Sequence, residues 1–576
     1  MAHYFRSTGT NWGNTGDWSS TPSSSGYTSV AAVPTVTDDV IFEAASANCI
    51  VNSIGRVCKS ITFATYTNTI QMTFDITVSG AITFGASMNV HTTGSGGIGS
   101  IVTSTITPNG FTWPNSFTFG GTGQTYTLAG NMTIGGAMIT QNGGTINGTG
   151  YKLSCTGITQ GNTSQGSSGT LTIELYGTGT WTGTAAVGWG FNTIINCVSL
   201  TITTGRIFGF ASTLPTLTYS GGFVSCSGLF TFFNCNVSTT GMTFADVRFG
   251  GSAVAALPVT LLSNMTVSGY FIIQGNIAVT ANGYQVDISG NLINNQVGVS
   301  SGGTTILNLV GTGSISSIGT VTSWSNPITI NSPAGTRTFS GTIPYRGNLT
   351  YTAGTIVSTG SILNLTTATL TINASGFNLA TINLAGSISI FTGTNGFTVA
   401  NLNCTTVGLV SFLKPANEYI ITTAFNSGQA DGVSKITYTS TNNVAVTATF
   451  SGTVMNVSAV IYGTISVGDT VFGSGIGTGV TVDSFGTGSG GVGSYNLSSS
   501  VGVLAVGRLI ITSPNTASYP KITLNNLGAQ TIYYTNAIDV DSTNGQTIWS
   551  FGSTLLRAFN WNMGTRPGGF SYTWVS

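Results

Sequence analysis

The residues of this chain that could do acid–base chemistry are few, and they fall in two short groups. Asp38, Asp39 and Glu43 lie near the amino terminus, and Asp539 and Asp541 lie near the carboxyl terminus. Hydrolysis of a glycosidic bond needs two carboxyl groups about 5 to 9.5 Å apart, one of them held protonated. The i, i+2 spacing of Asp539 and Asp541 would place both on one face of a strand. Either group could instead hold a cation.

A structural role explains the same carboxylates more simply. Asp38 and Asp39 precede a Val-Ile-Phe segment, and Asp residues commonly form the turn that starts a strand. The chain holds only 14 acidic residues, so a catalytic pair has few candidates. We therefore expect no catalytic residues, no cofactor and no metal site, and we keep a polysaccharide-degrading enzyme as an alternative.

Histidine and cysteine chemistry is also poorly supported. No Gly-x-Ser-x-Gly elbow with a usable histidine is expected, because His3 lies at the terminus and His91 has no sign of an activated nucleophile beside it, so no hydrolase triad is predicted. The seven cysteines form no Cys-x-x-Cys pair, and with two histidines in the chain a zinc site is not expected. We expect buried, reduced thiols that pack as small apolar residues. The seven are Cys49, Cys58, Cys155, Cys197, Cys226, Cys235 and Cys404.

Four tryptophans could stack on sugar rings in a glycan-binding groove, because an indole presents a large flat apolar face. They are Trp113, Trp181, Trp189 and Trp324. We expect them instead to pack at the corners of a repeat structure or between protomers. We keep a host-surface glycan as a candidate binding partner.

The composition predicts a folded β protein without a nucleic-acid partner. Charged residues make up 5% of the chain, against about 25% in ordinary domains, while 30 Phe and 19 Tyr argue against disorder. The 14 basic residues balance the 14 acidic ones and form no runs. The first residues lack the pattern of a secretory signal, and no apolar run is long enough to span a bilayer. We expect assembly in a host cytoplasm and release by lysis.

Short β-prone segments punctuated by Gly or Asn recur along the chain, and helical spacing is rare. Residues 126–134 match residues 259–267 at an offset of 133, and the similarity continues downstream to an offset of 135. Repeated strands without intervening helices predict a parallel β-helix, a solenoid whose coils stack on one another. Alternate residues of each strand would then fill a narrow core.

The predicted organisation has four parts. Residues 1–60 form an N-terminal capping or attachment segment, and residues 61–445 form the β-helix, with its internal duplication at about 126–205 and 259–340. Residues 446–512 form a Gly-rich β module inserted into it. Residues 513–576 form a capping C-terminal β segment.

Two stretches resemble known proteins: the first is similar to the opening segment of large β-helical proteins from phages and aquatic bacteria, and the second to a module of phage tail-fibre and structural proteins. The first holds Asn11-Trp12-Gly13, the segment Val33-Pro34-Thr35, the strand that begins at Asp38, and Cys58-Lys59-Ser60-Ile61. The second, more specific one spans residues 448–500, where Gly463 to Asp469 and Phe485 to Tyr495 resemble a small β module of tail fibres. The segment with Gln546 to Trp549 is similar to a final coil. The resemblance implies a virion structural role and transfers no catalytic residues.

The sequence therefore predicts a non-enzymatic bacteriophage virion protein, a tail fibre, spike or other fibre that attaches to the host surface. Its expected partners are other virion proteins and a host glycan, with no nucleic acid and no membrane insertion. Low charge and abundant apolar residues favour a closed homo-oligomer, most simply a trimer. A bacterial surface adhesin is the second alternative, beside the polysaccharide-degrading spike.

Overall fold

The computed structural model describes residues 1–563 apart from short segments. Those segments are residues 92–95, 141–144, 149, 162–164, 169–170, 184–187, 203–205, 209–213, 227, 251–257, 276–278, 297, 300–304, 319–320, 405, 407–408, 428–435, 474, 503, 513–518, 526–528, 533–534 and 551–554. The chain is 60% strand and 1% helix, and it forms a β-solenoid of about 20 turns with parallel sheets. The predicted fold class is therefore confirmed. In the described part of the chain, no helix is long and apolar enough to cross a membrane.

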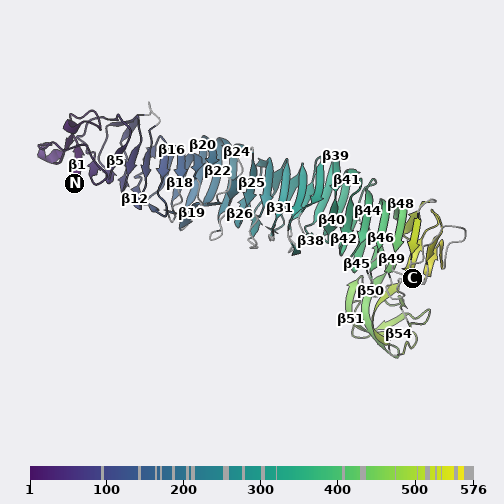
Figure 1. Ribbon diagram of the computed structural model, residues 1–576. Helices are drawn as coiled ribbons and strands as arrows, with labels where there is room; N and C mark the ends of the chain where they lie inside the picture. Colours follow the sequence, from purple (N-terminus) through teal and green to yellow (C-terminus); the bar gives the residue numbers. More distant parts are fainter. Residues whose placement is uncertain are drawn as a thin grey trace. The chain divides into compact units, whose positions relative to one another are not determined.

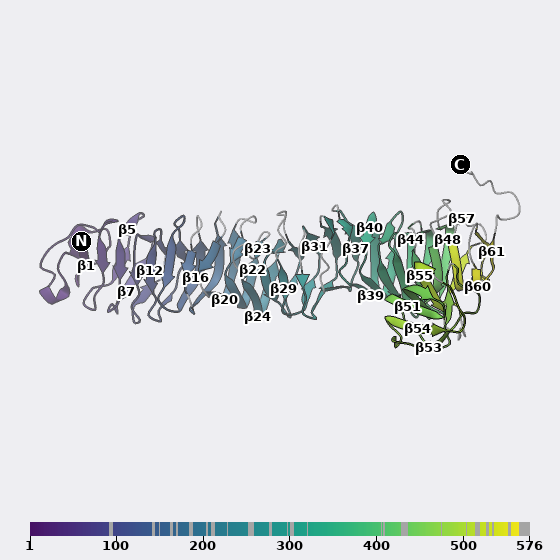
Figure 2. The same cartoon turned by 90° about the horizontal axis from the view of Figure 1, so that it is seen from below.

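The solenoid divides into two compact units. Unit 1 comprises Met1–Val297 and Gly303–Ile306, and unit 2 comprises Gly298–Gly302 and Leu307–Ser576. In each unit the strands of one ladder lie side by side, each hydrogen-bonded to the equivalent strand of the next coil (Figure 1; Figure 2).

Unit 1 is built on two long parallel ladders. The first contains β1 (Ala2–Phe5), β3 (Asp39–Ile41), β6 (Ser60–Thr62), β9 (Ile82–Thr83), β12 (Ser104–Thr107), β15 (Thr125–Leu128), β17 (Thr145–Asn147), β19 (Gln165–Ser168), β21 (Gly188–Gly190), β23 (Arg206–Phe208), β25 (Leu229–Phe232), β28 (Asp246–Phe249), β31 (Tyr270–Gln274) and β34 (Asn291–Asn295). The second contains β5 (Arg56–Cys58), β8 (Ile76–Val78), β11 (Ile98–Ser100), β14 (Phe117–Phe119), β16 (Met132–Thr140), β18 (Lys152–Gln160), β20 (Thr172–Gly183), β22 (Asn192–Ile202), β24 (Thr216–Cys226), β26 (Cys235–Ser238), β29 (Val259–Leu261) and β32 (Val279–Thr280).

Shorter elements complete unit 1. They are β2 (Trp18–Ser19), antiparallel to β1; β4 (Cys49–Val51), β7 (Thr69–Met72) and β10 (Asn89–His91), one parallel sheet; β13 (Thr112–Trp113), beside β16; β27 (Thr243–Phe244), β30 (Met265–Val267) and β33 (Gln285–Ile288), a third ladder; and the 3-10 turns Thr15–Asp17 and Ser23–Ser25. The two similar segments begin on β15 and β29, which belong to different ladders. Their offset of 133 residues therefore does not correspond to a whole number of coils.

Unit 2 repeats the plan. One ladder contains β36 (Ile306–Leu309), β39 (Ile328–Ser340), β41 (Asn348–Val357), β43 (Ala368–Ile372), β45 (Ile388–Gly393), β47 (Val410–Leu413), β49 (Ile436–Ser440), β58 (Thr535–Asp541) and β60 (Leu555–Phe559). The other contains β40 (Thr342–Tyr345), β42 (Ile362–Leu365), β44 (Asn378–Leu384), β46 (Thr398–Cys404) and β48 (Glu418–Ser427), followed by β56 (Lys521–Leu524) and β57 (Ala529–Ile532). The remaining parallel strands are β35 (Gly298–Val299), β38 (Val321–Ser323), β37 (Gly313–Ser317), β59 (Ile548–Ser550) and β61 (Trp561–Met563).

Alternation of side chains explains both the core and the surface. Along β44, Leu379, Ile382 and Leu384 are buried, whereas Thr381 and Asn383 between them are partly exposed. In-register stacking repeats this pattern of buried and exposed positions from coil to coil, since Ile382 pairs with Leu402 of β46. Neutral polar side chains consequently form rows on the outer face, and apolar ones form a continuous interior.

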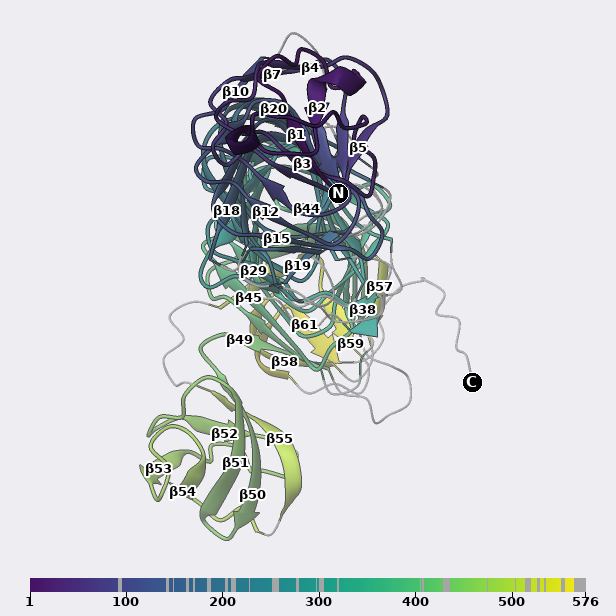
Figure 3. The ribbon, with the colours of Figure 1, turned by 90° about the vertical axis from the view of Figure 1, so that its left-hand side faces the viewer.

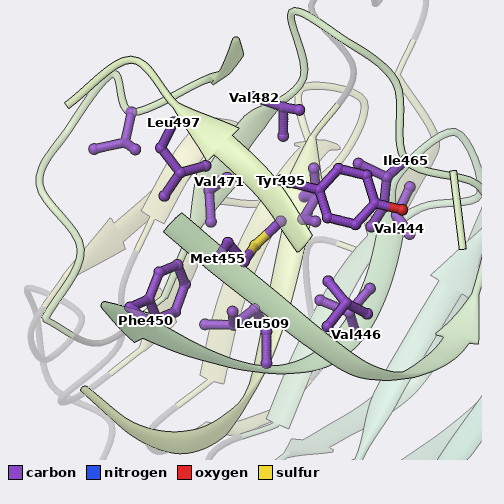
Figure 4. Packing of buried hydrophobic residues seen from close by; sticks show 14 residues of the cluster. Val444, Val446, Phe450, Met455, Ile465, Val471, Val482, Tyr495, Leu497 and Leu509 are labelled. Carbon is purple, nitrogen blue, oxygen red and sulfur yellow. The ribbon is translucent and has the colours of Figure 1, made fainter. Parts of the chain in front are cut away.

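Six strands of unit 2 form a separate antiparallel sheet, which we call the module. They are β50 (Val444–Ser451), β51 (Val454–Tyr462), β52 (Thr470–Phe472), β53 (Val482–Phe485), β54 (Gly493–Leu497) and β55 (Leu504–Thr512). The module has its own core, in which Val446, Met455, Val471 and Tyr495 meet (Figure 4). Seen along the stack, its strands gather in a closed group beside the coils of unit 2 (Figure 3).

The module replaces a short corner of one coil. In the preceding coil, residues 414–417 connect β47 to β48; one coil later, residues 441–520 make the same connection. The N–H of Thr441 donates to the Leu413 carbonyl, and the N–H of Lys521 donates to the Asn417 carbonyl, both at 2.8 Å. Both ends of the insertion are thus held at the ends of the corner beneath them.

A second apolar cluster attaches the module to the coils. Phe412 of β47 packs on Tyr462 of β51, with ring centroids 4.2 Å apart. The cluster consists of Val410, Phe412, Ala445, Ile510 and Ile538, with Ile388, Ile390, Ile461 and Phe472 packed against it. This contact explains why all four residues of β47 are buried instead of alternating.

Candidate functional site

The amino-terminal carboxylates are held in turns. Asp38 Oδ2 accepts hydrogen bonds from the N–H (3.0 Å) and Oγ1 (2.6 Å) of Thr35, and Asp38 Oδ1 lies 3.4 Å from His3 Nε2. Although partial burial raises the pKa of Asp38, these hydrogen bonds outweigh it and lower the pKa to about 2. Such a carboxyl group is ionised at neutral pH and cannot act as a general acid.

The neighbouring acids also have structural partners. Asp39 accepts a 2.6 Å hydrogen bond from Ser60 Oγ of the next coil, and its other oxygen lies 3.5 Å from Lys59 Nζ. Glu43 accepts a 2.7 Å hydrogen bond from the N–H of Ser23. The contact of Glu43 fixes a loop and that of Asp39 ties two coils together, whereas the turn before the strand is formed by Asp38 and Thr35.

The carboxyl-terminal pair does not share a face, contrary to the expectation from its i, i+2 spacing. Asp539 has a left-handed φ of +59°, which interrupts the alternation of β58. It is fully buried, and its Oδ2 accepts a 2.8 Å hydrogen bond from Asn443 Nδ2. Asp541 is partly exposed and accepts from the N–H of Thr543. Because Asp539 has a left-handed backbone conformation, side chains do not alternate regularly here, and the i, i+2 spacing does not place the two carboxylates on one face.

The four tryptophans considered for sugar stacking are buried in the solenoid, each with 1% or less of its surface exposed. Trp113 donates its indole N–H to the Ser116 carbonyl, and Trp189 donates to Thr193 Oγ1. Trp181 and Trp189 pack edge to face at 5.4 Å. Trp324 donates to Asn326 Oδ1. They pack within the coils and present no face to a ligand.

The described cysteine side chains are buried, and all six are free thiols. Burial raises the pKa of the Cys58, Cys155 and Cys404 thiols to about 12, so they are protonated and unreactive at neutral pH. The Cys226 side chain lies outside the described residues. Within the described ranges, no group of three or more His, Cys, Asp or Glu residues is placed to hold a metal ion.

An open groove of about 330 Å³ crosses three successive coils of unit 2 at one corner. It is lined by residues 375–378, 394–398, 416–418 and 420, which connect β43 to β44, β45 to β46 and β47 to β48. Asn378 pairs with Thr398, and Thr398 pairs with Ile420, so the three corners stack in register. We call this the corner groove; it ends one coil before the corner that carries the module.

The corner groove has an apolar floor and polar walls. Phe377 and Phe397 are buried beneath it, and Phe397 packs on Tyr419 with ring centroids 5.1 Å apart. Asn417 Nδ2 donates to the Asn395 carbonyl at 2.9 Å and so links two of the corners. Because Gly396 lies against the Glu418 carbonyl, the corners approach closely enough to form one continuous wall.

Glu418 is the one charged residue of the lining. Its Oε1 accepts hydrogen bonds from Thr523 Oγ1 and from Asn544 Nδ2 (3.0 Å), and these bonds, helped by the charge of Lys521, lower the pKa of Glu418. The carboxylate is therefore ionised and held in place. Sequence reasoning missed this site, although Ser375-Gly376-Phe377 and Asn395-Gly396-Phe397 recur one coil apart.

Comparison of the chain with models of known protein families, with curated protein sequences and with solved structures finds no match.

Proposed function

We propose that this chain is a non-enzymatic structural component of a bacteriophage virion, a tail fibre or spike that contacts the host surface. The observation that carries the proposal is the outer face of the coils, where in-register neutral side chains repeat. Thr329, Thr350, Thr371 and Thr392 stack on four consecutive strands, and Thr371 and Thr392 hydrogen-bond at 2.8 Å. A continuous hydrogen-bonded ladder with such a surface suits a load-bearing attachment part.

The carboxylates support the same proposal, because those weighed as catalytic serve as turn and inter-coil ties. A depolymerase would need two carboxyl groups facing one substrate, one of them with a raised pKa. Asp38 has the opposite shift.

The test is to band particles from a producing culture in a density gradient and identify their proteins by mass spectrometry. We expect the chain to sediment with capsid and tail proteins, and antibodies against it to block adsorption of the particles to cells. Recovery in the cell-envelope fraction would support a bacterial adhesin instead. Shortening of host polysaccharide by the purified protein would overturn the non-enzymatic assignment.

The proposal includes a closed homo-oligomer, most simply a trimer, with other virion proteins as further partners. Exposed apolar side chains such as Val198 and Phe223, 72% and 66% exposed, are consistent with a surface covered in the assembly. Light scattering coupled to gel filtration measures the mass directly. A stable monomer at micromolar concentration would contradict this part.

A further inference from the structure

We propose that the corner groove binds a segment of a neutral polysaccharide. The inference rests on the proposed attachment function and names where on the chain, and to what chemistry, attachment occurs. No charge run and no exposed tryptophan marks the site; the stacking of three corners creates it.

The geometry of the corner groove suits a repeating ligand. Its three corners follow one another at the strand spacing of a sheet, about 4.8 Å, which is close to the length of one sugar residue. The first two corners offer similar groups, Asn378 beside the buried ring of Phe377 and Thr398 beside that of Phe397, and the third corner contributes Glu418. Its volume of about 330 Å³ falls within the roughly 300–1,000 Å³ range of small-ligand sites. A chain of sugars can therefore lie across the coils in register with the corners.

The hydrogen-bonding groups of the corner groove are suited to hydroxyls. The side chains of Ser375, Asn378 and Thr398 have no hydrogen-bond partner among the described residues. The Oε1 of Glu418 is occupied by Thr523 and Asn544, while its Oε2 has no hydrogen-bond partner within the described part of the chain. An ionised carboxylate oxygen accepts strongly from a sugar hydroxyl, and the amide of Asn378 supplies both a donor and an acceptor.

The charge of the corner groove selects against acidic polymers. No lysine or arginine belongs to its lining, and although Lys521 on the neighbouring strand offsets part of the charge of Glu418, this carboxylate would repel a uronate carboxylate or a sulfate group in contact with it. Bacterial surface polysaccharides differ in this property, so the groove would discriminate between neutral and acidic types.

The experiment is affinity electrophoresis of the full chain through gels that contain single polysaccharides. The neutral probes are dextran, mannan and a panel of neutral O-antigen polysaccharides, and the acidic probes are alginate and hyaluronan. We expect retardation by at least one neutral polymer and at least tenfold weaker binding by Asn378→Ala. Asn348→Ala is the matched control, because Asn348 is an exposed asparagine of the same unit outside the groove. It should bind as the unchanged chain does.

A second variant tests the basis of selectivity. Glu418→Gln keeps an acceptor for Thr523 and Asn544 but removes the charge. This variant should bind the neutral polysaccharide more weakly, and the difference in affinity between the neutral polysaccharide and alginate should become smaller. The inference is overturned if no neutral polymer retards the chain, if Asn378→Ala binds normally, or if the acidic polymers bind better. If such a result is obtained while the chain is still found in virions, glycan binding by the corner groove is rejected and the proposed virion function is retained.

Discussion

The coils and the module of unit 2 are both all-β, but they make their contacts over very different distances in the sequence. A coil strand pairs in parallel with a strand about 20 residues away, as β44 does with β46, and its core continues into the next coil. The module strands pair antiparallel, and only β50–β51 and β53–β54 are hairpins; the other pairs join distant segments, as Val444 pairs with Ile511, around a core of the module's own. A coil therefore depends on its neighbours, whereas the module depends mainly on itself.

This difference predicts that the module can be removed if the coil surface beneath it is repaired. We expect replacement of residues 441–520 by the preceding corner, Lys414-Pro415-Ala416-Asn417, to leave the coils folded, because both ends of the insertion are held at that corner. The variant should aggregate, since it exposes Phe412 and its apolar neighbours.

Changing Ile388, Ile390, Val410 and Phe412 to Thr in the same variant should restore the outward pattern of the bare coils and prevent aggregation. Circular dichroism and light scattering distinguish the two variants. Loss of strand signal in the repaired variant would mean that the module is required for the coils to fold. Deleting only residues 448–500 would cut β50 and is a poorer test.

A methyl group added between two coils should lower the stability of the protein more than a methyl group added to the surface of the module. The Cβ of an alanine at Gly396 would lie 1.7 Å from the Glu418 carbonyl oxygen, so Gly396→Ala must push two coils apart. We expect it to lower the free energy of unfolding by about 3 kcal/mol. Gly491→Ala in the module meets nothing within 4 Å and should change stability by less than about 0.5 kcal/mol. Denaturant unfolding of both variants measures the difference; equal effects would show that the coils can separate easily.

A buried cation distinguishes the coil interior from the apolar core of the module. Arg337 of β39 is fully buried, and burial lowers its pKa to about 10. We expect Arg337→Met, which keeps the volume without the charge, to be neutral or stabilising. Arg337→Ala should lower stability by about 2 kcal/mol, because it leaves a cavity. If both variants are equally destabilised, the guanidinium itself holds the coil together.

Two turns of the same type should respond to pH in opposite directions. In each, an Asp accepts a hydrogen bond from the N–H three residues earlier: Asp38 from Thr35, and Asp469 of the module from Ser466. The pKa of Asp38 is lowered to about 2, so its contribution is present above pH 4 and is lost as the pH falls from about 4 to 2. The pKa of Asp469 is raised, because burial outweighs its hydrogen bond, so its contribution is present at low pH and lost as the pH rises through the folded-state pKa.

At pH 7, Asp38→Asn should therefore destabilise by at most about 1 kcal/mol, since the site is partly exposed. Asp469→Asn keeps the acceptor and should stabilise slightly at pH 7, with the gain disappearing below the pKa. Thermal unfolding of both variants from about pH 2 to 7 checks both expectations. The same sign of change for the two variants at pH 7 would contradict the comparison.

The strands, the corners and the position of the module could be predicted because they depend on local patterns in the sequence. Alternation of apolar and polar residues, as along β44, and the turns made by Gly and Asn specify strands and corners without knowledge of the rest of the chain. The absence of helical spacing then leads to a solenoid. The sequence placed the inserted module at residues 446–512, and the antiparallel strands run from Val444 to Thr512.

The arrangement of the acidic pair and the corner groove could not be predicted from local patterns. Asp539 and Asp541 have the spacing of a one-faced pair, but a left-handed residue separates them. The corner groove joins residues 375–378, 394–398, 416–418 and 420, and their contact depends on the number of residues in each coil and on close approach at Gly396. No single corner contains the groove, so no local pattern indicates it.

The sequence by itself determined that the chain is β, that its turns recur and that its surface is neutral, because these properties follow from neighbouring residues and from composition. Tertiary structure alone decided which corners stack, which outward side chains the module covers and which acids have partners. These outcomes depend on coil length and register, so residues about 20 positions apart, or about 100 in the case of Asn443 and Asp539, become neighbours only when the solenoid closes.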